Sequence, residues 1–340
     1  MRVLTLFGLL IAIALPPAAA GQATAGCASV GNVQFVCGQQ APEDLALVPG
    51  SQWVFASVFG GNGGVRLISV GDHTSTVAYP SATSRDRLDA KTYDTCPGPP
   101  DAEDKAKFTT HGLAIRIGKN SMHTLYAVHH GKRESIEVFE VDARGKMPTL
   151  TWVGCAVAPD PIGLNSVVPL PKGGFIGTDF LARGGDPSAR TKMMAGEPNG
   201  ALWEWHTGKG WKKVPGSEAA GANGLEVSKD GKWLYVAAWG SQSFFRLSLG
   251  QNPPKRDSIP LGFRVDNIRW APDGSIFASG QGATTSNVVK INPNTLKVQE
   301  IIKQANTPEF GSGTVAVQIG KEIWVGSFRG ERIAIFPATP

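Results

Sequence analysis

Four short polar pairs recur along this chain, and each stands at the start of a segment with the pattern of a β-meander. The pairs are Glu43-Asp44, Asn165-Ser166, Asn223-Gly224 and Asp266-Asn267. Carboxylate and amide oxygens suit a hard cation such as calcium, which takes about six to eight oxygen ligands. The pairs lie too far apart for one contiguous calcium loop. Only a fold that returns the chain repeatedly to one axis can bring them together.

A repeated unit of strand, turn and strand supplies such a fold. An Asp-Gly-Lys turn at 230–232 leads into an apolar run at 233–237, and a polar turn then leads into a second run at 243–247. The same order recurs at 53–56 with 65–68, 124–128 with 135–139, 175–177 with 200–205, 276–278 with 288–291, and 323–325 with 333–336. Units of about 40 to 60 residues with three or four short strands are typical of propeller blades.

We therefore expect an all-β fold, a six-bladed β-propeller with calcium in its central channel. A strand-like run at 32–36 precedes the first unit. We expect this N-terminal strand to complete the final blade and close the ring, because closure removes exposed sheet edges. Segments 80–108 and 181–199 lack the strand pattern and are expected to form long loops on one face.

The N-terminus has the order of a secretory signal peptide. A basic residue, an apolar run at 3–15 and small residues at 18–20 follow one another. Cleavage after residue 20, or as late as 25, would leave a single propeller domain at 27–340. An N-terminal membrane anchor is the alternative, although the run is short for a bilayer span. No later stretch approaches the roughly 20 apolar residues of a membrane helix, so we expect a mature protein without a transmembrane segment, secreted or periplasmic.

The four cysteines suit an oxidising compartment. Cys27, Cys37, Cys96 and Cys155 allow three disulfide pairings, of which we favour Cys27 with Cys37 and Cys96 with Cys155. Their spacing lacks the close pairs of a zinc site.

Composition and charge exclude some classes of function. The chain has 340 residues, of which 41% are hydrophobic and 18% charged, which is enough for one large core. The formal charge is +5, and the basic residues are scattered and not gathered in a stripe. We therefore expect a small-molecule partner and no nucleic acid.

Five polar residues lie at the starts of the expected innermost strands: Glu43, His111, Asn165, Asn223 and Asp266. In a propeller these starts converge on one mouth of the channel. The alternative is that such residues merely cap turns between blades, as Asn and Asp often do. Recurrence at the same place in each blade favours the metal site.

Several strings in the same order over nearly the whole mature chain resemble the paraoxonase family of six-bladed, calcium-dependent lactonases and arylesterases. They are Pro42-Glu43-Asp44-Leu45, His111-Gly112-Leu113, Val128-His129-His130, Leu164-Asn165, Ala222-Asn223-Gly224-Leu225 and Val265-Asp266-Asn267-Ile268. The Ala-Asn-Gly-Leu string also resembles the wider gluconolactonase and senescence-marker group, whereas the His-Gly-Leu string favours paraoxonase.

The resemblance implies roles for particular residues. The catalytic calcium would be held by Glu43, Asn165, Asn223, Asp266 and Asn267, and His111 with His130 would match the histidine pair. A second, structural calcium would use Asp44 and the carbonyl of Leu113. Ser166 stands where the family has another acid, so one calcium is favoured over two.

The function we favour is hydrolysis of lactones and aryl esters by an exported, calcium-dependent enzyme. Calcium would polarise the carbonyl and His111 would act as general base, with His130 orienting it. His129 and His130 should face opposite ways along a strand, so one of them reaches the site. The chain contains no Gly-x-Ser-x-Gly string for a serine nucleophile.

Two other functions remain open. A sugar lactonase of the gluconolactonase type would use similar ligands with a polar lining, whereas Phe59, Trp239 and Phe328 could line an apolar site or pack between blades. A non-catalytic, calcium-stabilised binding propeller is the alternative from another class. The sequence leaves the physiological substrate, phosphotriesterase activity and oligomeric state undetermined.

Overall fold

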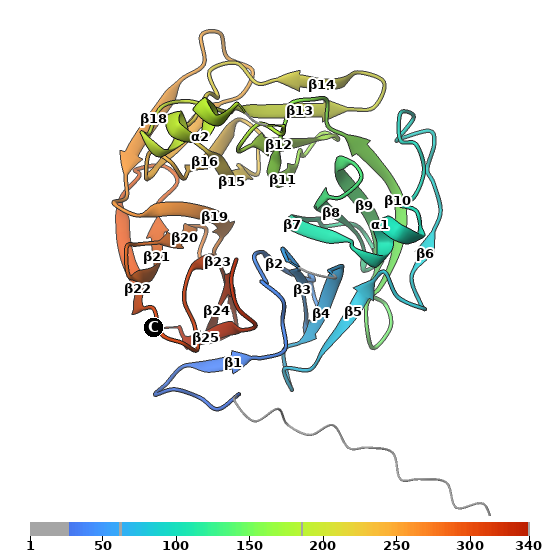
Figure 1. The fold of residues 1–340 in the computed structure, drawn as a ribbon, viewed down its shortest axis with the longest axis horizontal. Coiled ribbons are helices and arrows are strands. Elements are labelled where there is room, and N and C mark those ends of the chain that lie inside the picture. The colour runs from blue at the N-terminus through green and yellow to red at the C-terminus, as the bar shows by residue number, and fades with distance from the viewer. Residues whose placement is uncertain (1–26, 61–62, 185, 339–340) are drawn as a thin grey trace, which may run out of the picture.

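Six sheets surround a central axis in the computed structural model, which describes residues 27–60, 63–184 and 186–338 (Figure 1). The sheets are the blades of a six-bladed β-propeller, so the predicted fold is confirmed. The predicted signal peptide at 1–20 lies outside the described residues. Among those that are described, no helix is long and apolar enough to cross a bilayer.

Each blade runs outward from an innermost strand. The first blade contains β2 (Leu45–Leu47), β3 (Trp53–Ser57), β4 (Val65–Ser69) and β5 (Ser75–Tyr79). The second contains β7 (Thr109–Arg116), β8 (Met122–His130), β9 (Glu134–Asp142), β10 (Thr149–Val157) and, at its outer edge, β6 (Arg85–Asp86). The third contains β11 (Leu164–Pro169), β12 (Phe175–Asp179), β13 (Leu202–His206) and β14 (Gly210–Lys213).

The remaining three blades repeat this plan. The fourth contains β15 (Ala222–Val227), β16 (Trp233–Ala238), β17 (Ser243–Ser248) and β18 (Arg256–Pro260). The fifth contains β19 (Arg264–Trp270), β20 (Ile276–Gln281), β21 (Thr285–Ile291) and β22 (Val298–Ala305). The sixth contains β23 (Gly313–Ile319), β24 (Glu322–Ser327), β25 (Ile333–Pro337) and β1 (Gln34–Val36).

Burial within a blade follows the sequence pattern. The second strands are largely buried on both faces, and β16 is apolar throughout, because neighbouring blades cover them. The outermost strands β18 and β22 are polar and largely exposed. Large aromatic side chains such as Trp152 and Trp324 are fully buried between the sheets. Burying each contributes roughly 3 kcal/mol or more to the free energy of folding.

The ring closes as predicted. β1 pairs antiparallel with β25, with Phe35 opposite Ala334, so the N-terminal strand completes the blade built from the last strands of the chain. Cys27 and Cys37 form a disulfide that brackets this strand. The closing pair leaves the last blade without an open edge on β25.

The two long excursions contain more structure than the sequence pattern indicated. In the first, β6 pairs parallel with β10, and the helix α1 (Ala102–Ala106) starts where the side chain of Asp101 accepts a hydrogen bond from the backbone N–H of Asp104. In the second, α2 (Pro187–Met194) follows the N-cap Asp186. These short elements lack a strand period, which is why the sequence indicated loops.

The second predicted disulfide, Cys96 with Cys155, is also present and ties the first excursion to β10. Its cysteines are 59 residues apart, whereas Cys27 and Cys37 are 10 apart. A longer closed loop constrains the unfolded chain more. We predict that replacing Cys96 and Cys155 by Ser lowers the free energy of unfolding by about 2 to 4 kcal/mol, measured by urea denaturation. The Cys27 and Cys37 double variant is the control and should lose less. An equal or larger loss in the control would contradict this reasoning.

Candidate metal centre in the channel

Five innermost strands of the described chain carry a β-bulge near their starts, around the centre of the ring (Figure 1). At each bulge two consecutive residues oppose a single residue of the next strand, which re-aims their side chains. The bulged pairs are 111–112, 165–166, 223–224, 266–267 and 314–315. Three of the four recurring pairs in the sequence therefore mark bulges, and four of the five bulges contain a residue predicted for the site. Glu43-Asp44 instead lies just before β2.

Glycine at the second bulge position lets neighbouring inner strands approach closely. A Cβ atom on Gly112 would lie 2.6 Å from the Cα atom of Ser166. A Cβ atom on Gly224 would lie 2.6 Å from the Cα atom of Asn267. These separations are far below van der Waals contact, so the approach of the strands depends on the missing side chains.

Four predicted ligands each hold a buried oxygen that accepts no hydrogen bond from any residue that the structure describes. The atoms are Glu43 Oε2, Asn165 Oδ1, Asn223 Oδ1 and Asn267 Oδ1. A buried polar atom without a partner is destabilising, by about 1 to 3 kcal/mol, and is rare in folded proteins. Four such oxygens on residues from different blades indicate a common partner that binds oxygen.

The amide nitrogens of two of these residues are already engaged, which fixes the direction of the oxygens. Asn267 Nδ2 donates to Glu43 Oε1 over 2.5 Å, and Asn165 Nδ2 lies 3.3 Å from His111 Nε2. Asp266 Oδ2 accepts a hydrogen bond of 2.7 Å from Gln281 Nε2. Four of the five predicted ligands are thus linked to one another or to their immediate neighbours.

Buried negative charge surrounds these oxygens. Glu43, Asp44 and Asp266 are each at most 5% exposed. Burial, together with the charges of Asp266 and Asp44, holds the pKa of Glu43 well above its usual range, and burial raises the pKa of Asp266 to about 7. Among the described lysines and arginines, only Arg269 forms an ion pair with any of the three, and its partner is Asp44. Glu43 and Asp266 thus lack a fixed cation.

The donor set fits a hard cation. In the described ranges no three histidine, cysteine or carboxylate side chains form a metal-ligating group, so a metal here would rely on amide oxygens as well as carboxylates. Carboxylate and amide oxygens suit calcium and offer little to zinc, which prefers nitrogen and sulfur. The residues present therefore fit the predicted calcium.

A chain of hydrogen bonds leads from the channel to a buried carboxylate. His111 Nδ1 lies 3.0 Å from His130 Nε2, and His130 Nδ1 lies 2.9 Å from Glu134 Oε2. Glu134 Oε1 accepts a hydrogen bond of 2.6 Å from the backbone N–H of Leu164. With Glu134 ionised, His130 donates to it and accepts from His111, which leaves the lone pair on His111 Nε2 facing the channel.

The environment of His111 keeps it neutral. Burial and the neighbouring His130 hold the pKa of His111 well below its usual value, so at neutral pH its ring is unprotonated at one nitrogen. The ring of Phe59 lies 4.2 Å from the imidazole, centre to centre. His111 Nε2 is 3.7 Å from Glu43 Oε2. The basic nitrogen therefore lies beside the predicted metal ligands.

His129 and His130 point in opposite directions along β8. His129 is fully buried, stacks on Phe108 and bonds the carbonyl of Thr109 through Nδ1 over 2.9 Å. Its Nε2 lies 3.3 Å from Asp104. His129 thus packs α1 against the blade, and His130 is the member of the pair that reaches the channel.

An arginine occupies the place where the resemblance implies a second calcium. The guanidinium of Arg269 forms an ion pair with Asp44 and donates to the carbonyl oxygen of Leu113 over 2.8 Å. The carboxylate of Asp44 also accepts from the backbone N–H groups of Leu45, over 2.8 Å, and Leu113, over 2.6 Å. The groups implied for that ion are therefore already paired with a cationic side chain.

Three residues that join the site were not singled out from the sequence. Glu134 anchors the histidine chain, Gln281 holds Asp266, and the hydroxyl of Thr314 donates to the backbone carbonyl of Glu43 over 2.5 Å. Thr314 is a bulge residue of the sixth blade. Its position just before an apolar run could have identified it from the sequence. Glu134 and Gln281 carry no local pattern.

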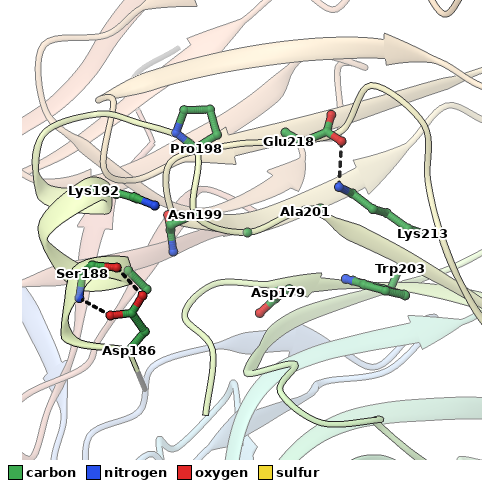
Figure 2. Close-up of a pocket in the computed structure, with 12 residues that line it drawn as sticks. Asp179, Asp186, Ser188, Lys192, Pro198, Asn199, Ala201, Trp203, Lys213 and Glu218 are labelled. Carbon is green, nitrogen blue, oxygen red and sulfur yellow. Dashed lines mark hydrogen bonds and ion pairs between the residues drawn. The ribbon is translucent and has the colours of Figure 1, made fainter. Parts of the chain in front are cut away.

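A separate cavity of about 350 Å³ lies beside α2, as Figure 2 shows. Lys213 pairs there with Glu218 over 2.7 Å, and burial raises the pKa of Asp179 to about 6. None of the described residues that line it belongs to the predicted site. The channel, and not this cavity, gathers the residues singled out from the sequence.

Comparison with known proteins shows the fold. No protein-family model matches the chain, and a search of curated proteins finds no match. A solved structure of luciferin-regenerating enzyme is 13% identical with a TM-score of 0.56, over 89% of this chain and 94% of that chain. A candidate gluconolactonase is 15% identical with a TM-score of 0.53, over 90% and 92%. The PQQ-bound aldose sugar dehydrogenase of Streptomyces coelicolor is 13% identical with a TM-score of 0.56, over 90% and 98%.

The likeness is one of architecture. At these identities it shows the propeller fold and leaves the chemistry to the residues of each channel. The names of these neighbours already span different reactions, so the function of this chain has to be argued from its own site.

Proposed function

We propose that this protein is an exported, calcium-dependent hydrolase of lactones and aryl esters. The observation that carries the proposal is a set of four buried side-chain oxygens, next to a neutral histidine, that find no hydrogen-bond donor in the described part of the chain. Lactonase-type proteins among the structural neighbours agree with it at the level of fold. The two disulfides fit a protein that reaches a secreted or periplasmic location.

The residues that would hold calcium are the five predicted ligands, Glu43, Asn165, Asn223, Asp266 and Asn267. When bound, the ion would polarise the carbonyl of the substrate and stabilise the oxyanion that develops on it. The carboxylates of Glu43 and Asp266 supply the negative charge that such an ion requires, and the amides complete the set without adding charge.

His111 is proposed as the general base. Its Nε2 would take the proton of the attacking water, and the resulting imidazolium would be stabilised through Nδ1 by His130 and, beyond it, by Glu134. His130 and Glu134 are positioning residues in this scheme, since they hold the tautomer in which His111 Nε2 carries no proton.

The surroundings of the base favour an apolar substrate. Phe59 packs on His111, and Trp239 donates through its indole N–H to Gln281, which in turn holds Asp266. Aromatic side chains next to the reacting groups suit an aryl or acyl substrate better than a polyol. Hydrolysis of an aryl ester, an aliphatic lactone and gluconolactone by the purified protein tests the proposal. Turnover of gluconolactone alone would favour the sugar lactonase, and no turnover with calcium bound would favour a binding propeller.

Replacement of His111 by Gln is predicted to lower kcat for an aryl ester about a hundredfold, because general base catalysis is lost. Calcium affinity, measured by calorimetry, should change little, since His111 is not among the proposed ligands. His206→Gln on β13 is the matched control and should keep wild-type activity. Retention of full activity in His111→Gln would contradict the assignment of the base.

The same site is proposed to bind one calcium per chain, with Arg269 in place of a second ion. The guanidinium supplies a fixed positive charge to Asp44 and a donor to the carbonyl of Leu113. Its planar group of donors satisfies a carboxylate and a carbonyl together. A fixed cation of this kind holds the inner strands of the first, second and fifth blades together without metal.

A further inference from the structure

Arg264 carries a buried donor without an acceptor at the edge of the candidate site. It is the first residue of β19 and lies two positions before Asp266. Its Nη1 atom is buried and has no hydrogen-bond partner among the described residues. Burying a guanidinium N–H group without a partner is unfavourable. The position is therefore costly for the folded protein unless another molecule supplies the acceptor.

The guanidinium is held by stacking. Its Cζ atom lies 4.1 Å from the centre of the Trp239 ring. The indole N–H of Trp239 donates to Gln281 Oε1 over 2.9 Å, and Gln281 Nε2 donates to Asp266 Oδ2 over 2.7 Å. One side chain, Gln281, thus separates the stacked pair from a proposed calcium ligand.

Arg332, over Phe35 of β1, also has a buried Nη1 without a partner among the described residues, so what distinguishes Arg264 is its place two residues before Asp266. A third stacked arginine shows that stacking and acceptors can occur together. Arg246 lies over Trp233, 4.9 Å from the ring centre, and its donors reach the carboxylate of Asp257 and two backbone carbonyls, over 2.8 to 3.1 Å. Arg246 therefore has its acceptors within the protein. Within the described ranges Arg264 has the stacking without such acceptors, so stacking alone does not account for its position.

We propose that Arg264 binds an anionic group of the substrate, so that the preferred lactones and esters carry carboxylate or phosphate oxygens. The hydrolysis of such a substrate rests on the proposed function, whereas the binding of its anionic group by Arg264 does not. A guanidinium is the side chain best suited to such oxygens, because its charge and its N–H groups act together. Trp239 fixes the plane of the group and so reduces the entropy lost when the anion binds.

The kinetic test compares two matched aryl esters, 4-carboxyphenyl acetate and its neutral 4-carbamoyl analogue. Wild-type protein should prefer the carboxylate, and Arg264→Met should raise its KM about 10- to 100-fold while changing the neutral ester less than about threefold. Arg264→Lys should recover part of the preference. Arg246→Met is the matched control and should leave both esters unchanged. Equal losses for the two esters in Arg264→Met would overturn the proposal.

A binding test separates this proposal from the proposed hydrolysis. Benzoate, phenyl phosphate and neutral benzamide are titrated against the calcium-loaded protein by calorimetry. Binding of benzoate or phenyl phosphate that falls at least tenfold in Arg264→Met supports the proposal, and the tighter anion identifies the group. This result can hold even if neither ester is hydrolysed. Anion binding that is absent, or the same in Arg264→Met, overturns the proposal even if both esters are hydrolysed.

Discussion

Chelation is expected to abolish ester and lactone hydrolysis by this protein, and added calcium to restore it. The loss should be at least about a thousandfold, because a metal that stabilises the oxyanion contributes several kcal/mol to the transition state. The measurement is initial rate with an aryl ester before chelation, after it, and after calcium is returned. Activity that survives complete removal of calcium would contradict the proposed metal centre.

A variant of one proposed calcium ligand tests whether the calcium that supports activity binds in the channel. The oxygen of Asn223 has no donor among the described residues, so its removal breaks no hydrogen bond seen for that oxygen. Calcium should raise the Tm of Asn223→Ala much less than it raises the Tm of the wild type. The Tm of the calcium-free protein should differ little between the two. Binding of an ion at a hundred times its Kd stabilises by about 2.7 kcal/mol. Asn294→Ala, in an exposed turn, is the control. An equal calcium effect in both variants would place the ion elsewhere.

Loss of Arg269 is expected to destabilise the fold by about 3 to 5 kcal/mol, because it would leave the buried carboxylate of Asp44 without its cation. The measurement is urea unfolding of Arg269→Met. A second variant that also changes Asp44 to Asn should recover much of the loss, since the uncompensated charge is gone. Arg144→Met breaks an exposed pair with Asp142 and should change stability little.

The metal content gives an independent check on Arg269. One calcium per wild-type chain is expected, measured by elemental analysis after dialysis. Two tightly bound ions per chain would contradict the proposal that the guanidinium takes the place of the second. A loss below 1 kcal/mol in Arg269→Met would show that the ion pair does not hold the inner strands.

The fold was predictable because its signals are local and repeated. Glycine turns between apolar runs indicate the blades. Gly231 and Gly274, for example, lie in such turns with φ of +70° and +84°. Ring closure by 32–36 followed from an unpaired strand at the start of the chain, and β1 confirms it. The disulfide pairs were one choice among three and are confirmed by the structure.

The candidate site was predictable in part. Three of the polar pairs are local signals, since the bulges that carry them interrupt apolar strands at a recurring place. Glu134, Gln281 and Arg269 were not singled out, because nothing in their own segments distinguishes them from ordinary polar residues of strands. Their roles depend on partners in other segments.

The sequence by itself determined the blades, their number and the residues that can offer oxygen at the axis, because periodicity, turn chemistry and composition act over a few residues. Only the tertiary structure decided which buried carboxylates are paired with a cationic side chain and which hydrogen-bond donors lack partners. Arg269 reaches Asp44 from 225 residues away, and Arg264 meets Trp239 from the neighbouring blade. Such pairings arise when the ring closes, since charge and hydrogen bonding act through space and not along the chain.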